Sequence, residues 1–272
     1  MSISELNLAH DRTLVIGILN VTSDSFADGG RYLGAADAIA RGLQMIAEGV
    51  DIIDIGGEST RPDAERISAE EELARVIPII SQLSQKGAVI SIDTTRAQTA
   101  KASIDSGAKI VNDISAGLYD AEMLHTVAGL NCPFIAMHTR GNSKTMTSLA
   151  KYNDVVSEVV DELSMRIEAA LYAGISKSNI ILDPGIGFAK GAEHNWELLN
   201  HIYTFEALGY PVLIGASRKR FLGELTGSSS PDSREAASIA LTALLAKRGV
   251  WGVRVHSVKE HRDAISVAGK VL

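Results

Sequence analysis

Eight short runs rich in Val, Ile and Leu alternate with amphipathic stretches along the chain. The runs have the nearly continuous apolar character of strands buried on both faces, rather than the alternation of a half-exposed sheet. They predict strands at Leu14–Leu19, Asp51–Ile55, Ala88–Ile92, Lys109–Asp113, Pro133–His138, Ile180–Asp183, Val212–Gly215 and Gly252–His256. The stretches between them have the apolar spacing of three and four residues that indicates helices. They predict helices at about Ala35–Glu48, Ser68–Leu83, Arg96–Ser106, Ala121–Gly129, Asn153–Ala173, Asn195–Leu208, Ser233–Lys247 and Val258–Val271.

Regular alternation of strands and helices predicts a parallel sheet, and eight such pairs close naturally into a (β/α)₈ barrel. The 272 residues suit one barrel, and no linker or low-complexity tract divides them. We therefore expect a single α/β domain over residues 1–272. The longest irregular segments, residues 20–34, 56–67 and 139–151, follow the first, second and fifth strands. Loops in those places lie on the catalytic face of a barrel, where they can cover a site.

Composition limits the partners and the compartment. The single cysteine, Cys132, cannot form an internal disulfide, which fits a reducing compartment and predicts a cytoplasmic location. The first residues lack the pattern of a signal peptide, and no apolar run is long enough to span a bilayer. The net charge of −7 argues against nucleic acid or an anionic membrane as the partner. We expect small-molecule substrates.

Polar groups stand where the predicted strands end. Because parallel strands point the same way, these side chains converge on one mouth of a barrel. The strand-end set comprises Asn20, Asp54 with Glu58, Asp93, Asn112 with Asp113, His138, Asp183, Ser217 with Lys219, and Arg254 with His256. One or two polar ends would be unremarkable, but this many predict a site.

The strand-end groups divide by chemistry. Asp93, Asn112 and Asp183 offer acceptors suited to a flat heterocycle with an amidine-like edge. Arg61, Lys219, Arg254 and His256 offer the donors and positive charge that suit phosphate. We expect carboxylates on one side of the pocket and cations on the other, around a heterocycle that carries a phosphate group. A glycine-rich turn at 54–62 and a cation-rich helix that begins near Ser217 favour the same ligand.

Eight ordered motifs make the chain resemble the dihydropteroate synthase family of pterin-binding barrels. The resemblance covers nearly the whole chain, and its motifs are GILNVTSDSFADGG (17–30), DIIDIGGESTRPDA (51–64), ISIDTTRAQTA (90–100), KIVNDISA (109–116), FIAMHTRG (134–141), ILDPGIGFAKGAEHN (181–195), GASRKRFLGELTG (215–227) and VRVHSV (253–258).

The resemblance implies a transferase of folate synthesis. It implies that 6-hydroxymethyl-7,8-dihydropterin diphosphate condenses with 4-aminobenzoate to give 7,8-dihydropteroate and diphosphate. It also implies Mg²⁺ as cofactor, a place among the targets of sulfonamides, and a homodimer formed through outer helices. The apolar stretch Ala236–Leu245 is the candidate dimer face. Sulfonamide sensitivity itself depends on loop details that the sequence leaves open.

The resemblance also assigns roles to individual residues. It implies that Asn20 helps to hold Mg²⁺ and that the catalytic residues are Asp93, Lys219, Arg254 and His256. The pterin would be bound by Asp93, Asn112, Asp183 and Lys219, with Ile114 and Met137 lining its slot. The diphosphate would be bound by Arg254, His256 and the backbone of Val255. The aminobenzoate and the loops that close over it would involve Phe26, Thr60, Arg61, Pro62, Phe188, Ser217 and Arg220.

Four positions depart from the commonest family pattern. Ser23 and Asp63 replace a proline and a glycine of two catalytic-face loops. Ser257 replaces an aspartate, which would loosen a supporting contact to His256. Arg220 replaces a serine, and we expect it to strengthen attraction for the aminobenzoate carboxylate unless it points to solvent.

Two other functions remain possible on the residues alone. A methyltetrahydrofolate methyltransferase barrel would share the Asp, Asn and Asp set but would not need Asn20, the helix with the motif SRK at 217–219, or the pair Arg254 and His256, and their presence argues against it. A pterin-binding relative without catalysis would not need the intact set of cations. Simpler structural roles are also open: Asp93 could cap a helix and Asp183 could form a turn. His138, Glu58 and Asp113 are expected to support loops rather than to bind ligands.

Overall fold

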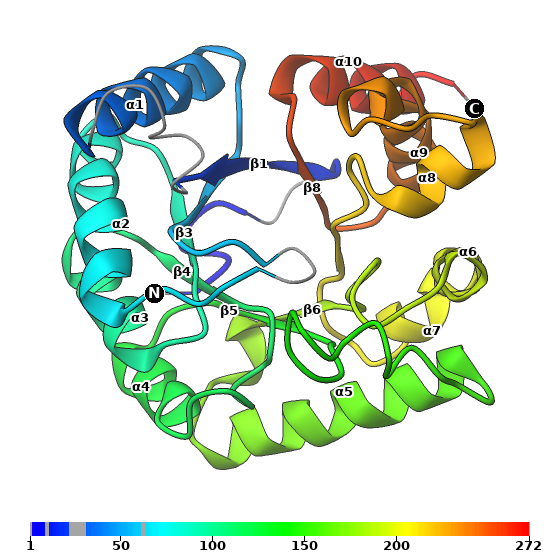
Figure 1. The fold of residues 1–272 in the computed structure, drawn as a ribbon, viewed down its shortest axis with the longest axis horizontal. Coiled ribbons are helices and arrows are strands. Elements are labelled where there is room, and N and C mark those ends of the chain that lie inside the picture. The colour runs from blue at the N-terminus through cyan, green and yellow to red at the C-terminus, as the bar shows by residue number, and fades with distance from the viewer. Residues whose placement is uncertain (1, 9–10, 22–30, 61–63, 272) are drawn as a thin grey trace.

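The protein folds as a ring of helices around a parallel sheet (Figure 1). The computed structural model describes residues 2–8, 11–21, 31–60 and 64–271. The strands are β1 (Leu14–Asn20), β2 (Ile52–Gly56), β3 (Ile90–Asp93), β4 (Ile110–Asp113), β5 (Phe134–Met137), β6 (Ile180–Asp183), β7 (Leu213–Ile214) and β8 (Gly252–Val255). The α-helices among the described residues are α1 (Arg31–Ala47), α2 (Ala69–Ser84), α3 (Ala97–Asp105), α4 (Met123–Leu130), α5 (Val155–Tyr172), α6 (Ala192–Asn200), α7 (Ile202–Glu206), α8 (Arg220–Thr226), α9 (Glu235–Lys247) and α10 (Val258–Ala268).

The sheet is a nearly closed barrel. Its hydrogen-bonded order is β6-β5-β4-β3-β2-β1-β8-β7, with every pairing parallel. A single parallel bridge between Leu182 and Val212 joins β6 to the neighbourhood of β7 and completes the ring. The predicted (β/α)₈ barrel is confirmed, and the observed strands lie within the predicted ranges to within one or two residues.

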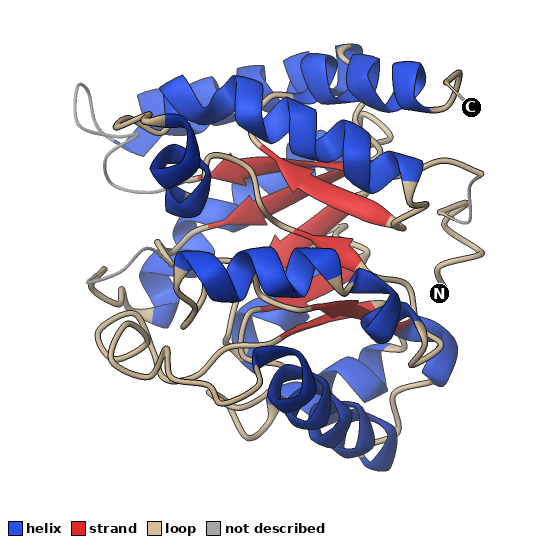
Figure 2. Ribbon diagram, turned by 90° about the vertical axis from the view of Figure 1, so that its right-hand side faces the viewer, coloured by secondary structure: helices blue, strands red, loops and turns tan. Residues whose placement is uncertain are grey.

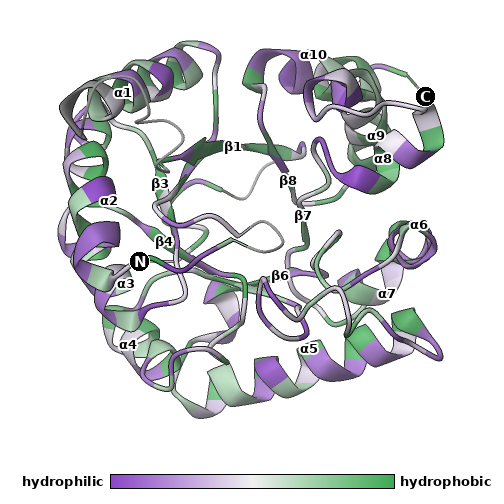
Figure 3. Ribbon diagram, in the orientation of Figure 1, coloured by the Kyte–Doolittle hydropathy of each residue, from purple (hydrophilic) through white to green (hydrophobic). Residues whose placement is uncertain are grey.

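Two apolar layers hold the barrel together. The inner layer fills the barrel with one or two side chains per contributing strand, and Ile3 and Leu8 of the N-terminal segment join it. The outer and larger layer packs the other strand faces against the helices. The strands are accordingly green in Figure 3, whereas the helices also carry hydrophilic residues. Strands buried on both faces explain why the sequence shows continuous apolar runs.

Loops gather at one end of the barrel. In Figure 2 the long loops lie on one side of the sheet, and both described chain ends lie on the other. The segments that follow β2 and β5 are long, as predicted, and the loop after β1 lies largely outside the described residues. In the described part of the chain, each helix is too short or too polar to cross a membrane.

Two helix predictions need correction. The helix predicted at 195–208 is divided into α6 and α7, because His201 between them has φ −111° and ψ 29°, outside the helical range. The helix predicted to begin near Ser217 begins at Arg220. Arg218 has a left-handed φ of 60°, which a helix interior does not allow, so the segment before Arg220 is a turn.

Candidate active site

The polar mouth of the barrel follows from the two-residue period of its strands. Side chains at positions i and i+2 of a strand point to the same side of the sheet. The inner-layer isoleucines of β2, β4 and β6 are therefore followed, two positions later, by the inward-facing Asp54, Asn112 and Asp183. The register of β3 and β4 places Asp93 beside Asn112, and Arg254 of β8 reaches this group through its hydrogen bonds to Asp54 and Asp93. A short apolar floor thus gives way to a ring of charged and amide groups.

Arg254 lies between two buried carboxylates. Its Nε donates to Asp54 Oδ2 at 2.6 Å, and its Nη2 donates to Asp93 Oδ2 at 2.7 Å. Asn112 Nδ2 donates to the same Asp54 oxygen at 3.0 Å, while Asp54 Oδ1 is buried without a hydrogen-bond partner. Burial opposes the charge on Arg254, yet Asp54 and Asp93 outweigh it and raise the pKa of the guanidinium. Burial raises the pKa of Asp93 to about 7, against the effect of Arg254.

Asp183 and Lys219 form the neighbouring part of the site. Burial raises the pKa of Asp183 and lowers that of Lys219 to about 7, and each charge opposes the shift of the other. A Cβ placed on Gly215 would lie 3.7 Å from Asp183 Oδ2 and 3.8 Å from Arg254 Cβ, so both border the same small volume. Lys219 Nζ donates to the carbonyl of Ile186 at 2.5 Å. Lys219 thus reaches from the turn after β7 to the turn after β6.

The expected division of the pocket into an acidic and a cationic side is not observed. Arg254 is embedded among Asp54 and Asp93, and Lys219 lies near Asp183. The physical reason is the cost of burial, because charges removed from water need partners of opposite sign nearby. The prediction assigned the acids to the heterocycle and the cations to phosphate, and did not consider that buried acids and cations also neutralise each other.

His256 stands at the edge of the charged cluster. Its Nδ1 lies 3.0 Å from Ser217 Oγ, and its backbone N–H donates to the same hydroxyl at 3.3 Å. Burial lowers the pKa of His256 to about 3, with help from the nearby charges of Arg218 and Arg254. The imidazole is therefore neutral at physiological pH and can donate one hydrogen bond to an anion.

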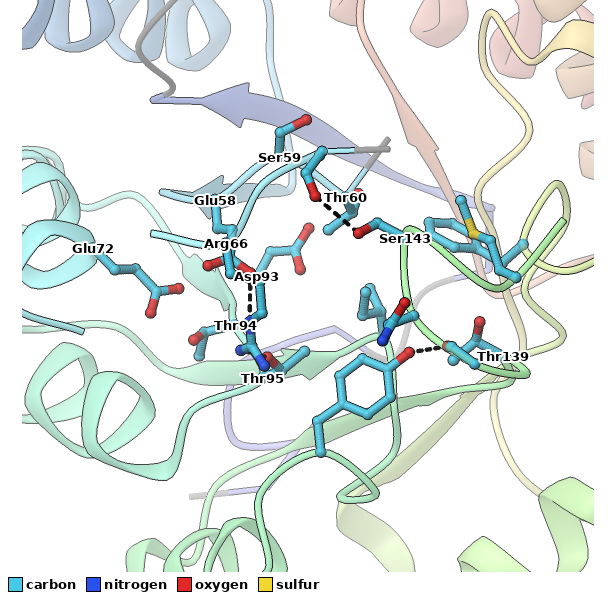
Figure 4. Close-up of a pocket in the computed structure, with 17 residues that line it drawn as sticks. Glu58, Ser59, Thr60, Arg66, Glu72, Asp93, Thr94, Thr95, Thr139 and Ser143 are labelled. Carbon is cyan, nitrogen blue, oxygen red and sulfur yellow. Dashed lines mark hydrogen bonds and ion pairs between the residues drawn. The ribbon is translucent and has the colours of Figure 1, made fainter. Parts of the chain in front are cut away.

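A cavity of about 310 Å³ opens beside Asp93 (Figure 4). Thr60, Asp93, Ile114 and Phe188, all predicted site residues, belong to its lining. The other described lining residues come mainly from the loops after β2, β3, β4 and β5, and Figure 4 shows Thr94, Thr95, Thr139 and Ser143 around it.

The loop after β2 is tied to the segment after β3 by the half-buried Arg96. Arg96 donates to Glu58 at 2.8 Å, to Glu72 at 2.9 Å and to the carbonyl of Ile67 at 2.5 Å. Glu58 also accepts from the backbone N–H of Ile67 at 3.1 Å, which is the loop-supporting role predicted for it. Asp113 supports the loop after β4 in the same way, through the N–H groups of residues 115 and 117.

Two simpler roles were open for the site carboxylates, a helix cap for Asp93 and a turn for Asp183. Asp93 does not cap α3, because the first N–H of that helix donates to Asp120 at 2.8 Å while Asp93 binds Arg254. Asp183 does stabilise a turn, since Oδ1 accepts from Gly185 N at 2.7 Å. This leaves Oδ2 directed to the space beside Gly215.

The described residues offer a sparse oxygen site for a cation. They contain no cluster of three or more His, Cys, Asp or Glu side chains that could hold a metal ion. Asn20 Oδ1 and Asp93 Oδ2 each lie 3.7 Å from a Cβ placed on Gly56, so both face the space above β2. Mg²⁺ commonly binds one or two protein oxygens and completes its shell with water and substrate phosphate. Asn20 therefore fits a metal that arrives with a diphosphate.

The comparisons with known proteins agree with this geometry. The family model described as "Pterin binding enzyme" matches residues 16–256. The chain belongs to the pterin-binding enzyme family. Among relatives of this family, the dihydropteroate synthase of Mycobacterium leprae is 48% identical over 94% of this chain and 92% of its own length.

Solved structures of pterin-binding enzymes share the fold. Xanthomonas albilineans dihydropteroate synthase with 4-aminobenzoic acid has a TM-score of 0.88 at 44% identity, covering 94% of this chain and 92% of that one. The enzyme from the same organism in complex with 7,8-dihydropteroate has a TM-score of 0.86 at 41% identity, covering 96% and 95%. A Yersinia pestis dihydropteroate synthase in a sulfonamide drug complex has a TM-score of 0.89 at 37% identity, covering 95% and 94%.

Some predicted site residues lie apart from the charged cluster or outside the described residues. Phe26, Arg61 and Pro62 lie outside the described residues, as do Ser23 and Asp63. The side chain of Arg220 is 78% exposed and pairs with Glu224 at 3.1 Å, so it points to solvent. Val255 packs its side chain into the outer apolar layer, which leaves only its backbone for a ligand. Met137 is buried beside Asp183 in the register of β5 and β6.

Ser257, which replaces the aspartate common in the family, takes part in a hydrogen-bond network with Glu235. Its hydroxyl donates to Glu235, which also accepts from Arg218 and lies 3.2 Å from His261 Nε2. Ser257 therefore contributes to a network around the first turn of α9. In the described structure the Ser257 hydroxyl bonds to Glu235, whereas the His256 ring meets Ser217.

Two buried side chains have roles that were not predicted from the sequence. Asp54 was recognised as a strand end, but its position at the centre of the Arg254 cluster was not predicted. Lys190 was overlooked, although it is only 8% exposed and lies behind Asp183. A lysine directly after the apolar and glycine-rich run 184–189 was the available signal, because such a run offers it little water.

Proposed function

We propose that the protein is a dihydropteroate synthase, which condenses 6-hydroxymethyl-7,8-dihydropterin diphosphate with 4-aminobenzoate. The observation that carries this proposal is the buried cluster of Asp54, Arg254 and Asp93 beside Asp183 and Lys219. It lies at the mouth of a barrel whose relatives of similar length are named for this reaction.

The carboxylates and the amide are suited to the pterin. Asp183 Oδ2 and Asn112 can receive the N–H groups of the amidine-like edge, while the Asn112 amide can also donate. Lys219 can donate to a ring acceptor from the opposite turn. The inner-layer side chains beneath provide an apolar floor, and Ile114, which borders the cavity, and the buried Met137 would line the walls. A flat, polar-edged ring therefore meets both its donors and its acceptors.

Arg254 and His256 are suited to the diphosphate that leaves. In the reaction the bond between the pterin methylene carbon and the diphosphate oxygen breaks, and its electron pair departs with the oxygen. Arg254 uses its Nε and Nη2 for the two carboxylates, so its Nη1 can donate to the diphosphate, and neutral His256 can donate a further hydrogen bond. Donors aimed at charge that grows during the step stabilise the transition state more than the ground state.

Asn20 would hold Mg²⁺ against the diphosphate through its Oδ1. When bound, the cation supplies Lewis-acid stabilisation of the leaving group. Asp93, whose Oδ2 faces the same space, can stabilise positive charge that builds on the pterin as the bond breaks.

The 4-aminobenzoate would enter beside Phe188 and Thr60. Its neutral amine attacks the methylene carbon, a new C–N bond forms, and the nitrogen then releases a proton. The ring of Phe188 borders the cavity and offers a stacking surface, while Lys219 Nζ lies 4.0 Å from the centre of that ring. Exclusion of water by the surrounding loops protects the electrophilic carbon. This route needs no covalent enzyme intermediate.

The proposal extends to assembly and location. We propose a homodimer that uses α9, where Leu244 is 65% exposed. A cytoplasmic location fits the free, buried thiol of Cys132. The sulfonamide complex of the Yersinia pestis relative supports the proposal that sulfonamides compete for the aminobenzoate position here.

The function is tested by incubating the purified protein with the pterin diphosphate, 4-aminobenzoate and Mg²⁺. We expect dihydropteroate by mass spectrometry and one diphosphate released per product, with neither formed when one substrate is omitted. A methyltransferase-type barrel would instead bind methyltetrahydrofolate without diphosphate release. A non-catalytic relative would bind the pterin and release nothing, and either result would refute the proposal.

A further inference from the structure

A buried lysine that the proposed reaction does not use lies behind the turn that carries Asp183 and Phe188. Lys190 Nζ lies 2.9 Å from His138 Nδ1 and donates to the carbonyl oxygen of Phe188 at 2.9 Å. Burial of an ammonium group is unfavourable unless its donors find acceptors. Lys190 is therefore stabilised at this buried position by the two acceptors, His138 Nδ1 and the carbonyl of Phe188.

The Glu162 carboxylate sets the direction of the hydrogen bonds that His138 makes beside Lys190. His138 Nε2 lies 2.9 Å from Glu162 Oε2, and a carboxylate can only accept, so Nε2 carries the imidazole proton. Nδ1 is then free to accept from Lys190 Nζ. Burial lowers the pKa of His138 to about 4, so the ring stays neutral and keeps this tautomer. Lys190 thus donates to His138 and His138 donates to Glu162, which also accepts from Arg140 Nε at 2.9 Å.

The turn between Asp183 and Phe188 is fixed against the same histidine. His138 N donates to the carbonyl of Asp183 at 2.9 Å, which anchors the start of the turn. Gly185 then passes so close to the His138 carbonyl that a Cβ would lie 1.9 Å from its oxygen. Phe188 N donates to Gly185 O at 3.0 Å, and Lys190 binds the carbonyl of Phe188 from below. His138 thus anchors the start of the turn directly, and its end through Lys190.

We propose that Lys190 is a positioning residue that sets the Phe188 ring for the aminobenzoate. The proposal deepens the proposed function and rests on it, because there Phe188 contacts that substrate. The effect should concentrate on 4-aminobenzoate. Asp183 keeps the charges of Lys219 and Arg254 nearby when Lys190 is lost, so the pterin end is less dependent on it.

The first test is Lys190→Met, which keeps the length of the side chain but removes its donors and charge. We expect KM for 4-aminobenzoate to rise about tenfold, the scale of one lost buried hydrogen bond. KM for the pterin diphosphate should change less than about threefold, on the same free-energy scale. Lys259→Met is the matched control, because the Lys259 side chain is 67% exposed and pairs with Asp263, which is exposed as well. It should behave as the wild type.

A second pair of variants separates positioning from general stability. In His138→Asn the amide oxygen can take the place of Nδ1 and still accept from Lys190. In His138→Gln the amide reaches the place of Nε2 and can donate to Glu162, but the acceptor for Lys190 is lost. We expect the Gln variant to raise KM for 4-aminobenzoate and the Asn variant to remain close to the wild type. This pair tests whether Lys190 depends on an acceptor at the position of Nδ1, even if Lys190→Met does not fold.

The outcomes are distinct. Suppose that the wild type makes dihydropteroate. An equal KM for 4-aminobenzoate in His138→Asn and His138→Gln, or an unchanged KM in folded Lys190→Met, would then overturn the role of Lys190. Wild-type protein that makes no dihydropteroate would instead overturn the proposed function itself.

Discussion

At the scale of single residues, the chemistry depends on how buried charges neutralise one another. Arg254 and its two carboxylates are held in place by contacts of 2.6 and 2.7 Å. A ligand that binds here does not find an isolated cation but a guanidinium already oriented by acids. Orientation of this kind lowers the cost of reorganisation when charge appears on a leaving group.

The pairing of Arg254 with Asp54 predicts a partial rescue. Arg254→Ala should lower the free energy of unfolding by about 3 kcal/mol, because it leaves the fully buried Asp54 without its countercharge. Adding Asp54→Asn should recover part of that loss but no activity. Urea denaturation and the product assay together measure both. If the double variant were less stable than the sum of the two single changes, the unpaired charge would not be the cause.

The neutral state of His256 predicts a pH dependence. Its pKa is about 3 in the folded protein and about 6.5 in an unfolded chain, so the unfolded state binds more protons between those values. His256 therefore stabilises the fold above pH about 6.5 and loses that contribution as the pH falls. The difference in unfolding free energy between wild type and His256→Gln should shrink by about 2 kcal/mol from pH 7 to pH 4.5. A constant difference would contradict the buried, neutral imidazole.

At the scale of elements, the turn after β6 is a rigid platform. Gly185 has a φ of 70° and no room for a Cβ beside the His138 carbonyl. We predict that Gly185→Ala destabilises the protein by about 3 kcal/mol and abolishes turnover, because the turn must move away from β5. Gly129→Ala in α4 is the control, since nothing lies within 4 Å of its Cβ position. It should be neutral or slightly stabilising in thermal unfolding, as alanine favours a helix.

Element boundaries illustrate what the sequence could and could not predict. The strands were predictable because their apolar runs are short, continuous and bounded by polar ends. The break at His201 and the turn before Arg220 depend on single backbone angles, which periodicity does not encode. Likewise, Lys190 and Glu162 meet at His138 only through the fold, because their pairing joins three separate elements. Long-range partners of this kind require the fold before they can be named.

At the scale of the whole molecule, the barrel brings distant residues to one mouth. Asp54 and Arg254 are 200 positions apart in the sequence and share a hydrogen bond because β2 and β8 both flank β1. The convergence of strand ends was predictable from the parallel fold, whereas the interleaving of acids and cations was not. Convergence is a property of topology, and neutralisation is a property of burial.

The central claim is that one mouth of the barrel receives the pterin and its diphosphate side by side. A crystal structure of the protein soaked with the pterin diphosphate tests it most directly. We predict the amidine-like edge of the pterin at Asp183 and Asn112, and the diphosphate at Arg254 and His256. A pterin bound on any other surface, or a diphosphate directed away from Arg254, would contradict the account.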